Sequence, residues 1–276
     1  VALGKVFIYA GSATDLGASP AAEWPGAIAD AGLGAMNAGD INGDGISDLI
    51  ATALNYSGVA TASGAVFAFH GAPGFPAGTP DWSFLGIQEA GRSGDTLHLL
   101  DANGDGYDDL VVGSTGFDAA ADPAVYSGRA DLFYGSSAGL AASASWNTAP
   151  GAAWQFFAAS GTAADFNADG YDDLLLGTGY KKALRHYRGG PSGLTQVSET
   201  VRTPNWWGAT VDARGDVDGD GYPDAVVAWQ SGAGQLSVHR GGPSLNLAAS
   251  DVDLWFPALS WNVLAGVDFN RDGLGD

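Results

Sequence analysis

Short runs of apolar residues recur along this chain, and glycine, aspartate or asparagine residues flank each run. Four of these runs lie at residues 49–53, 110–113, 174–177 and 225–228. They are short and lack a 3.6-residue period, so each predicts a buried β-strand. A second strand that ends in glycine is predicted at 5–11, 65–71, 130–135, 184–189 and 236–241.

An acidic loop of nine residues stands directly before each of these apolar runs, with the pattern D-x-(D/N)-x-D-G-x-x-D. Five copies occur, at 40–48, 101–109, 165–173, 216–224 and 268–276. Position 6 is glycine in every copy, as a tight turn with positive φ requires. The loops connect predicted strands and have no flanking helices, so the EF-hand motif does not fit.

Two weaker segments complete each repeat. A more polar segment follows the second strand, and in four copies it carries a tryptophan, namely Trp24, Trp82, Trp146 or Trp255. A short strand then leads into the next acidic loop, as at 158–164 and 209–215. The chain therefore predicts four strands and no helix per repeat of 51–64 residues. Four-stranded repeats of this length are typical of antiparallel β-propeller blades, so we predict an all-β propeller.

The spacing of oxygen-bearing side chains in the acidic loop predicts a metal site. Side chains at positions 1, 3, 5 and 9 and the carbonyl of position 7 converge if the loop curls, and such an oxygen set suits Ca²⁺. The predicted ligands at positions 1, 3, 5, 7 and 9, loop by loop, are Asp40, Asn42, Asp44, Ile46 and Asp48; Asp101, Asn103, Asp105, Tyr107 and Asp109; Asp165, Asn167, Asp169, Tyr171 and Asp173; Asp216, Asp218, Asp220, Tyr222 and Asp224; and Asp268, Asn270, Asp272, Leu274 and Asp276.

Charge and composition agree with calcium binding and narrow the class of partner. The 276 residues include 31 acidic and 11 basic side chains, which gives a formal net charge of −20, and 18 of the acids lie in the five loops. So many carboxylates in short loops repel one another unless a cation lies between them. The charge also argues against nucleic acid as a partner, and no apolar run is long enough for membrane insertion. The chain has no cysteine, which excludes disulfides and thiolate chemistry.

The acidic loop together with its following strand, as in residues 103–113, resembles the FG-GAP repeat, the calcium-binding propeller repeat of integrin α subunits. Similar propellers occur in bacterial secreted proteins and some fungal lectins. The resemblance covers essentially the whole chain, although the Phe-Gly and Gly-Ala-Pro elements of the name are degenerate here. It implies an extracellular, secreted or cell-surface adhesion and recognition module with up to five Ca²⁺ and a glycan or protein ligand.

The number of blades follows from how the two ends of the sequence match. Residues 268–276 end at position 9 of the fifth loop, and residues 1–4 read like the strand that follows such a loop. We therefore predict a single domain over 1–276, with four continuous blades and a fifth, composite blade made from 1–30 and 258–276. Part of a larger, seven-bladed propeller is the alternative.

The remaining aromatic and histidine residues leave the ligand open. The repeat-phased tryptophans are expected between blades, whereas Trp154, Trp206, Trp207 and Trp261 are the candidates for a sugar-binding surface. The four histidines fall at different repeat offsets and are expected on strand surfaces, so no catalytic site is predicted. A non-enzymatic module is the leading hypothesis. The alternatives are an accessory or catalytic module of a polysaccharide-active enzyme and a purely structural scaffold.

Overall fold

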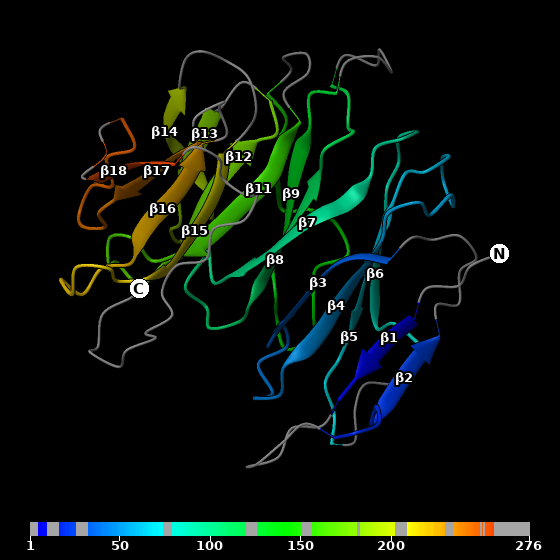
Figure 1. Cartoon of the computed structure of the whole chain (residues 1–276). Coiled ribbons are helices and arrows are strands. Elements are labelled where there is room, and N and C mark those ends of the chain that lie inside the picture. Colours follow the sequence, from blue (N-terminus) through cyan, green and yellow to red (C-terminus); the bar gives the residue numbers. More distant parts are fainter. Residues whose placement is uncertain are drawn as a thin grey trace.

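The computed structural model of this chain describes residues 5–9, 17–25, 33–73, 79–119, 126–150, 156–180, 183–201, 209–229, 234–248, 250 and 252–256. Within these ranges every regular element is a β-strand. Four sheets contain four antiparallel strands each, and the strands follow one another across every sheet in chain order. Figure 1 shows these sheets arranged side by side. The prediction of an all-β chain built from four-stranded propeller-type blades is confirmed.

We number the four sheets as blades in chain order. Blade 1 contains β3 (Leu33–Gly39), β4 (Asp48–Ala53), β5 (Ala65–Phe69) and β6 (Trp82–Leu85). Blade 2 contains β7 (Ser93–Leu100), β8 (Asp109–Ser114), β9 (Arg129–Phe133) and β10 (Trp146–Thr148). Blade 3 contains β11 (Phe157–Ala164), β12 (Asp173–Thr178), β13 (Ala183–Arg188) and β14 (Thr195–Val201). Blade 4 contains β15 (Ala209–Gly215), β16 (Asp224–Trp229), β17 (Gly234–His239) and β18 (Val252–Phe256).

The second strand of each blade is the apolar run that follows an acidic loop. Every residue of β8, β12 and β16 is buried, and β8 and β12 each belong to a blade with a described neighbour on both sides. The last strand of blade 3, β14, alternates between exposed and half-buried residues, as expected for the outer edge of a blade. The first strands contact one another in the order β3, β7, β11 and β15. They therefore form the side of the blades that would face a propeller axis.

The hydrophobic core lies between blades rather than in one central cluster. One cluster joins blades 1 and 2 through residues such as Ile50 and Leu110, and two further clusters join blade 2 to blade 3 and blade 3 to blade 4. The residue at position 2 of each of the first three acidic loops belongs to these clusters, namely Ile41, Ala102 and Phe166, and all three are fully buried. Burial of position 2 thus anchors each acidic loop to the contact between two blades.

Two repeat-phased tryptophans lie between blades, as predicted. Trp82 of blade 1 packs edge-on against Phe133 of blade 2 with a centroid distance of 5.0 Å, and its Nε1 donates to the carbonyl of Ala141 at 2.9 Å. Trp146 of blade 2 packs edge-on against Tyr187 of blade 3 at 5.2 Å. Large aromatic side chains of this kind contribute strongly to packing between sheets. The side chains of Trp24 and Trp255 lie outside the described part of the structure.

The predicted composite blade is described only in part. Near the N-terminus β1 (Lys5–Ile8) pairs with β2 (Ala22–Pro25) in a two-stranded antiparallel sheet. Residues 257–276, which hold the predicted C-terminal contribution and the fifth acidic loop, lie outside the described residues. Within the described ranges no strand pairing joins the first sheet to the last. Closure into five blades therefore stays a prediction, as does the seven-bladed alternative.

The histidines are less exposed than the sequence suggested. We expected them on strand surfaces, but the exposed fractions of His186 and His239 are 2% and 0%, so that expectation is wrong for both residues. The reason lies in contacts that the sequence does not show, because His186 packs edge-on against Phe166 and His239 Nδ1 lies 3.2 Å from the carbonyl oxygen of Asn246. His186 Nε2 lies 3.4 Å from a carboxylate oxygen of Asp173, and His239 Nε2 lies 3.0 Å from the hydroxyl of Ser237.

His98 gives the fold a specific pH dependence. It lies on β7 against β11, its Nε2 is enclosed without a hydrogen-bond partner among the described residues, and burial lowers the pKa of His98 to about 4. Between pH 6.5 and about 4 the unfolded chain gains a proton at this residue and the folded chain does not, so the stability contribution rises with pH across this window. On acidification from neutral pH to about pH 4.5, the wild type should lose stability at this residue, whereas His98→Leu has no such group to protonate. The loss of unfolding free energy should therefore be smaller in His98→Leu than in the wild type, by up to about 2.5 kcal/mol.

Urea unfolding of both proteins at the two pH values tests this expectation. The slope of unfolding free energy against urea concentration should be the same in the wild type and in His98→Leu, because both expose a similar surface on unfolding. An equal loss of stability in both proteins on acidification would contradict the assignment to His98.

Candidate metal centres in the acidic loops

Each described acidic loop connects the first strand of a blade to its second strand. The loops at 40–48, 101–109, 165–173 and 216–224 therefore lie at the same end of the four blades. The glycine at position 6 adopts a positive φ in all four, between 81° at Gly45 and 92° at Gly221. This left-handed turn is accessible to glycine at little cost, and it folds the second half of the loop back toward its first residue.

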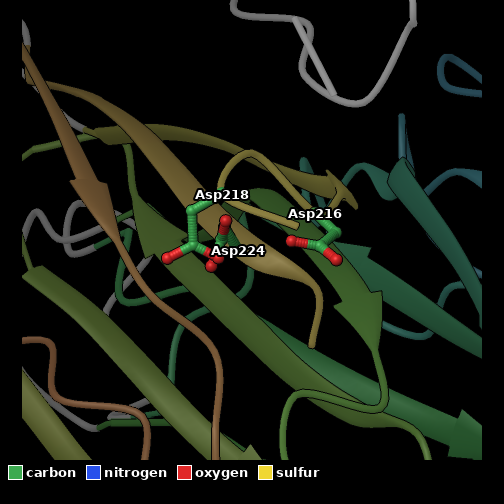
Figure 2. A group of neighbouring side chains, drawn as sticks. All are labelled: Asp216, Asp218 and Asp224. Atoms are coloured by element: carbon green, nitrogen blue, oxygen red, sulfur yellow. The ribbon is translucent and has the colours of Figure 1, made fainter. Parts of the chain in front are cut away.

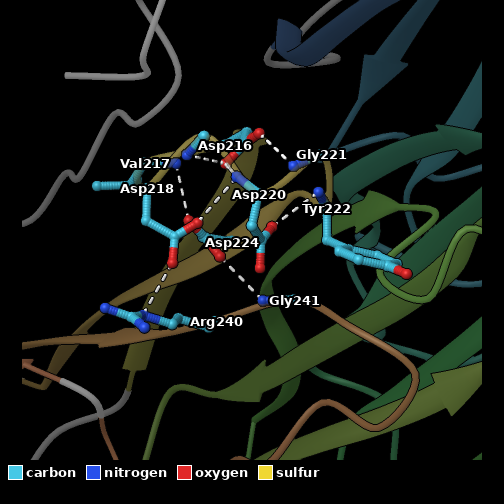
Figure 3. Close-up of polar contacts among 10 residues, drawn as sticks. Asp216, Val217, Asp218, Asp220, Gly221, Tyr222, Asp224, Arg240 and Gly241 are labelled. Carbon is cyan, nitrogen blue, oxygen red and sulfur yellow. Dashed lines mark hydrogen bonds and ion pairs between the residues drawn. The ribbon is translucent and has the colours of Figure 1, made fainter.

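The aspartate at position 1 organises the turn. In the fourth loop, Asp216 Oδ1 accepts hydrogen bonds from the amides of Gly219 and Asp220 at 2.6 and 3.1 Å, and Oδ2 accepts from Gly221 at 2.8 Å (Figure 3). These backbone donors, Gly221 first, lower the pKa of Asp216. Asp40 and Asp101 accept hydrogen bonds from the same three loop positions. The carboxylate at position 1 is therefore held inside the curl of the loop.

The aspartate at position 9 ends the loop, and its side chain is fully buried in all four described copies. Asp109 accepts from the amide of Ala102, at position 2, at 3.1 Å and from Gly135, just beyond β9, at 2.8 Å. Asp48 and Asp224 make the same pair of contacts. Burial raises the pKa of all three, to about 7 for Asp109, where nearby Asp105 and Asp101 add to the effect.

The fourth loop brings three carboxylates together. One carboxylate oxygen each from Asp216, Asp218 and Asp224 lies within 4.8 Å of the other two (Figure 2). Asp218 Oδ2 also pairs with Arg240 Nε at 2.9 Å, so that guanidinium partly neutralises the cluster. Asp220 accepts a hydrogen bond from the amide of Tyr222 at 3.0 Å (Figure 3). The cluster offers only hard oxygen donors, which fits a divalent ion such as Ca²⁺.

The first three loops share this frame with an asparagine at position 3. Asn42, Asn103 and Asn167 each accept a hydrogen bond through Oδ1 from the amide of position 5, at 2.8–3.0 Å. In the fourth loop Asp218 accepts the corresponding bond at 3.2 Å. The side chains at positions 1, 3 and 5 of the four loops thus share one hydrogen-bonded frame, and among the described residues the fourth loop alone groups three carboxylates. The fifth loop, Asp268 to Asp276, and the candidate sugar-binding residues Trp154, Trp206, Trp207 and Trp261 lie outside the described residues.

Position 8 has a role that the sequence analysis missed. Asp108 Oδ2 accepts from the amide of Asp40 at 2.8 Å, and the amide of Asp108 donates to the carbonyl of Asp40 at 3.1 Å. Asp172 makes the same two contacts with Asp101, at 3.0 and 2.9 Å. Position 8 of the fourth loop is Pro223, which has neither an amide hydrogen nor a carboxylate. The Asp-Asp doublets at positions 8 and 9 were the available signal for this link between neighbouring loops.

We expect Asp108→Ala to destabilise the chain by about 1.5–3 kcal/mol, because it removes a charged acceptor from a partly buried backbone amide. Burial raises the pKa of Asp108, and relief of that unfavourable burial offsets part of the loss. Ser47→Ala, at the exposed position 8 of the first loop, is the matched control and should change stability by less than about 0.5 kcal/mol. Urea unfolding measures both. Equal stability of the two variants would contradict a structural link through Asp108.

Comparison with known proteins supports the resemblance seen in the loops. The model of the FG-GAP-like repeat family matches residues 165–227, which span the third and fourth acidic loops. Mouse integrin α-8 is 29% identical over 185 residues, which cover 60% of this chain and 17% of integrin α-8. Chicken integrin α-V is 28% identical over 234 residues, which cover 77% of this chain and 21% of integrin α-V. The chain thus spans about a fifth of the length of these relatives.

Among solved structures, a rhamnogalacturonan lyase from Bacillus licheniformis aligns with 70% of this chain and 39% of its own, at 15% identity and a TM-score of 0.45. A TM-score this low does not establish a common fold. In the part of the chain that the structure describes, no helix has the length and apolar character to cross a membrane. The repeat match and the integrin similarity agree with what the loops indicated: residues 165–227 match the FG-GAP-like repeat, and the chain is similar to integrin α subunits.

Proposed function

We propose that this chain is a calcium-binding, non-enzymatic recognition module that acts outside the cell. The arrangement of the acidic loops carries the proposal. Carboxylates from positions 1, 3 and 9 of the fourth loop meet within 4.8 Å, and the other described loops repeat the same hydrogen-bonded frame. The similarity to integrin α subunits supports both the calcium and the extracellular location.

Calcium fits the loops better than magnesium. The oxygens come from side chains that are already fixed by backbone amides, and Ca²⁺ accepts six to eight such oxygens in flexible geometry, whereas Mg²⁺ demands a strict octahedron. Bound calcium would supply positive charge between carboxylates that otherwise repel one another. Its role is structural, because the buried aspartate at position 9 connects every described loop to backbone amides, and position 2 in the first three loops and position 8 in the second and third add further links.

We propose recognition rather than catalysis because the grouped carboxylates of the described loops are already hydrogen-bonded to backbone amides of the loops and their neighbours. The carboxylates of positions 1 and 9 accept two or three backbone hydrogen bonds each in the first, second and fourth loops. The carboxylates at position 9, including Asp109 with its pKa of about 7, are also fully buried, so a substrate cannot reach them for proton transfer. The partner is a glycan or a protein on a cell surface or in a matrix.

Two measurements on the whole chain test the proposal. Isothermal titration with calcium should reveal four to five sites, because four described loops share the frame and the sequence predicts a fifth. A glycan and matrix-protein array, probed with and without calcium, should give binding that chelation abolishes. Absence of calcium binding would overturn the proposed metal role. Turnover of a polysaccharide would overturn the non-enzymatic assignment.

A further inference from the structure

A cleft opens at the end of the blades opposite the acidic loops. It consists of two adjoining hollows of about 440 and 550 Å³ that share Arg92, Thr115 and Phe156. We call the two hollows together the junction cleft. Its residues come from connectors that follow the second strand of a blade or precede the first strand, and from the beginnings of β7 and β11, whereas the acidic loops follow the ends of the first strands. Blades 1, 2 and 3 all contribute, so the cleft exists only in the assembled structure.

Aromatic side chains form one wall of the junction cleft. Phe156 stacks on Tyr126 with a centroid distance of 5.4 Å and an interplanar angle of 21°. Tyr180 lines the smaller hollow and is 38% exposed. The backbone holds the wall in place, because the amide of Phe156 donates to the carbonyl of Tyr126 at 3.2 Å and its carbonyl accepts from Gly179 at 3.0 Å. These contacts present half-buried rings to solvent at the contact of blades 2 and 3.

A locked ion pair forms the polar side of the cleft. Arg92 Nη2 and Nε donate to the two carboxylate oxygens of Asp95 at 2.7 and 2.9 Å, and the hydroxyl of Thr115 also donates to that carboxylate. The Arg92 side chain is 52% exposed, and its Nη1 has no hydrogen-bond partner among the described residues. Nη1 thus keeps two N–H groups for a ligand, in an orientation that Asp95 fixes.

Backbone conformation around the cleft is unusual. Six described residues other than glycine have a positive φ, and four of them line the cleft, namely Ala62, Ala90, Arg92 and Phe156, with φ between 46° and 53°. Such conformations are unfavourable for L-residues and concentrate at ligand-binding sites, where the surrounding structure maintains them. In the junction cleft, Arg92 and Phe156 both have this conformation, and both line the smaller hollow.

We propose that the junction cleft binds a neutral oligosaccharide, an assignment that rests on the proposed recognition function. The C–H face of a sugar ring packs on exposed aromatic rings, and adjacent hydroxyls accept from a guanidinium that is already oriented. The lining carries no net charge, because Arg92 and Asp95 neutralise each other, and the chain as a whole has a charge of −20. An anionic glycan is therefore disfavoured. The open, mostly apolar lining with few polar groups is typical of small-ligand sites.

The test uses the whole chain in calcium and three variants. Cellotetraose, mannotetraose and galactotetraose are the neutral probes, tetragalacturonate is the anionic probe, and calorimetric titration with saturation-transfer NMR is the readout. At least one neutral probe should bind saturably. Phe156→Ala and Tyr180→Ala should each weaken that binding about tenfold, the effect expected for loss of one stacked ring. Phe7→Ala, which removes a 47% exposed ring on β1, is the matched control and should bind like the wild type.

Three results would overturn the assignment. These are no binding of any neutral probe, tighter binding of tetragalacturonate than of every neutral probe, and unchanged binding in Tyr180→Ala, which removes a ring that is 38% exposed. Calcium titration of the same samples separates this proposal from the broader one. Calcium binding without sugar binding removes the cleft assignment alone, whereas sugar binding without calcium binding removes the metal role alone.

Discussion

Removal of calcium with EDTA should lower the melting temperature of this chain by more than about 10 °C. A single site occupied at a hundredfold excess of calcium over its dissociation constant contributes about 2.7 kcal/mol, and one kcal/mol corresponds to about 2–4 °C for a chain of this size. Two occupied loops are therefore sufficient. The shift should grow at low ionic strength, because repulsion among the three or four carboxylates of each loop is then least screened.

Differential scanning calorimetry at low and high NaCl concentration, with calcium or with EDTA, measures this effect. Magnesium at the same concentration is the control for ion type, and it should restore less of the melting temperature than calcium does. Equal melting temperatures in calcium and EDTA at low salt would contradict a structural role of the metal. The arrangement of the loops would then reflect hydrogen bonding alone.

The repeating part of the fold could be predicted because one short pattern occurs five times in register. The glycine at position 6 and the apolar run after position 9 are local features, and local features set the turn and the buried strand that follow. The tryptophans that begin β6 and β10 were also predictable as contacts between blades, because a large ring at a constant repeat offset meets the same neighbour in each repeat.

Features that depend on contacts between blades could not be predicted in the same way. The burial of His186 follows from the blade that covers β13, and the link from Asp108 to Asp40 joins residues 68 positions apart. The sequence shows the Asp-Asp doublet but not the amide that its first member accepts from. Register between blades, not the pattern within one blade, decides both features.

The junction cleft also depends on contacts between blades, and it was even less predictable from the sequence. Arg92 and Phe156 stand at the same offset, directly before the first strand of a blade, but they differ in residue type and Tyr126 lies in another connector, so no repeated residue type marks the cleft. The positions of the three residues depend on connectors of different length. Two of them, Arg92 and Phe156, also adopt a positive φ. The tryptophans proposed from the sequence as a sugar-binding surface lie outside the described residues. The cleft therefore provides a second candidate, one that only the folded arrangement could indicate.

Substitutions at positions 9 and 5 of the second loop should separate the scaffold role of the carboxylates from their metal role. Asp109 accepts from two buried amides, those of Ala102 and Gly135, so Asp109→Ala leaves both donors unsatisfied. Such losses cost about 1.5–3 kcal/mol each, and relief of a buried carboxylate whose pKa lies near 7 offsets part of the total. We expect a net loss of about 3 kcal/mol in EDTA, where only the scaffold role is lost, and a larger loss in calcium, because position 9 is also a predicted ligand.

Asp105→Asn is the matched variant at an exposed position of the same loop. An asparagine there can still accept the hydrogen bond from Tyr107 through its amide oxygen, so the turn is retained while one negative charge is lost. In EDTA this variant should be as stable as the wild type or slightly more stable, because a repulsive charge near Asp101 and Asp109 is removed. In calcium it should be less stable, because the ion loses a charged ligand. Urea unfolding of both variants in the two buffers measures the pattern, and a calcium-independent effect of Asp105→Asn would place the ion elsewhere.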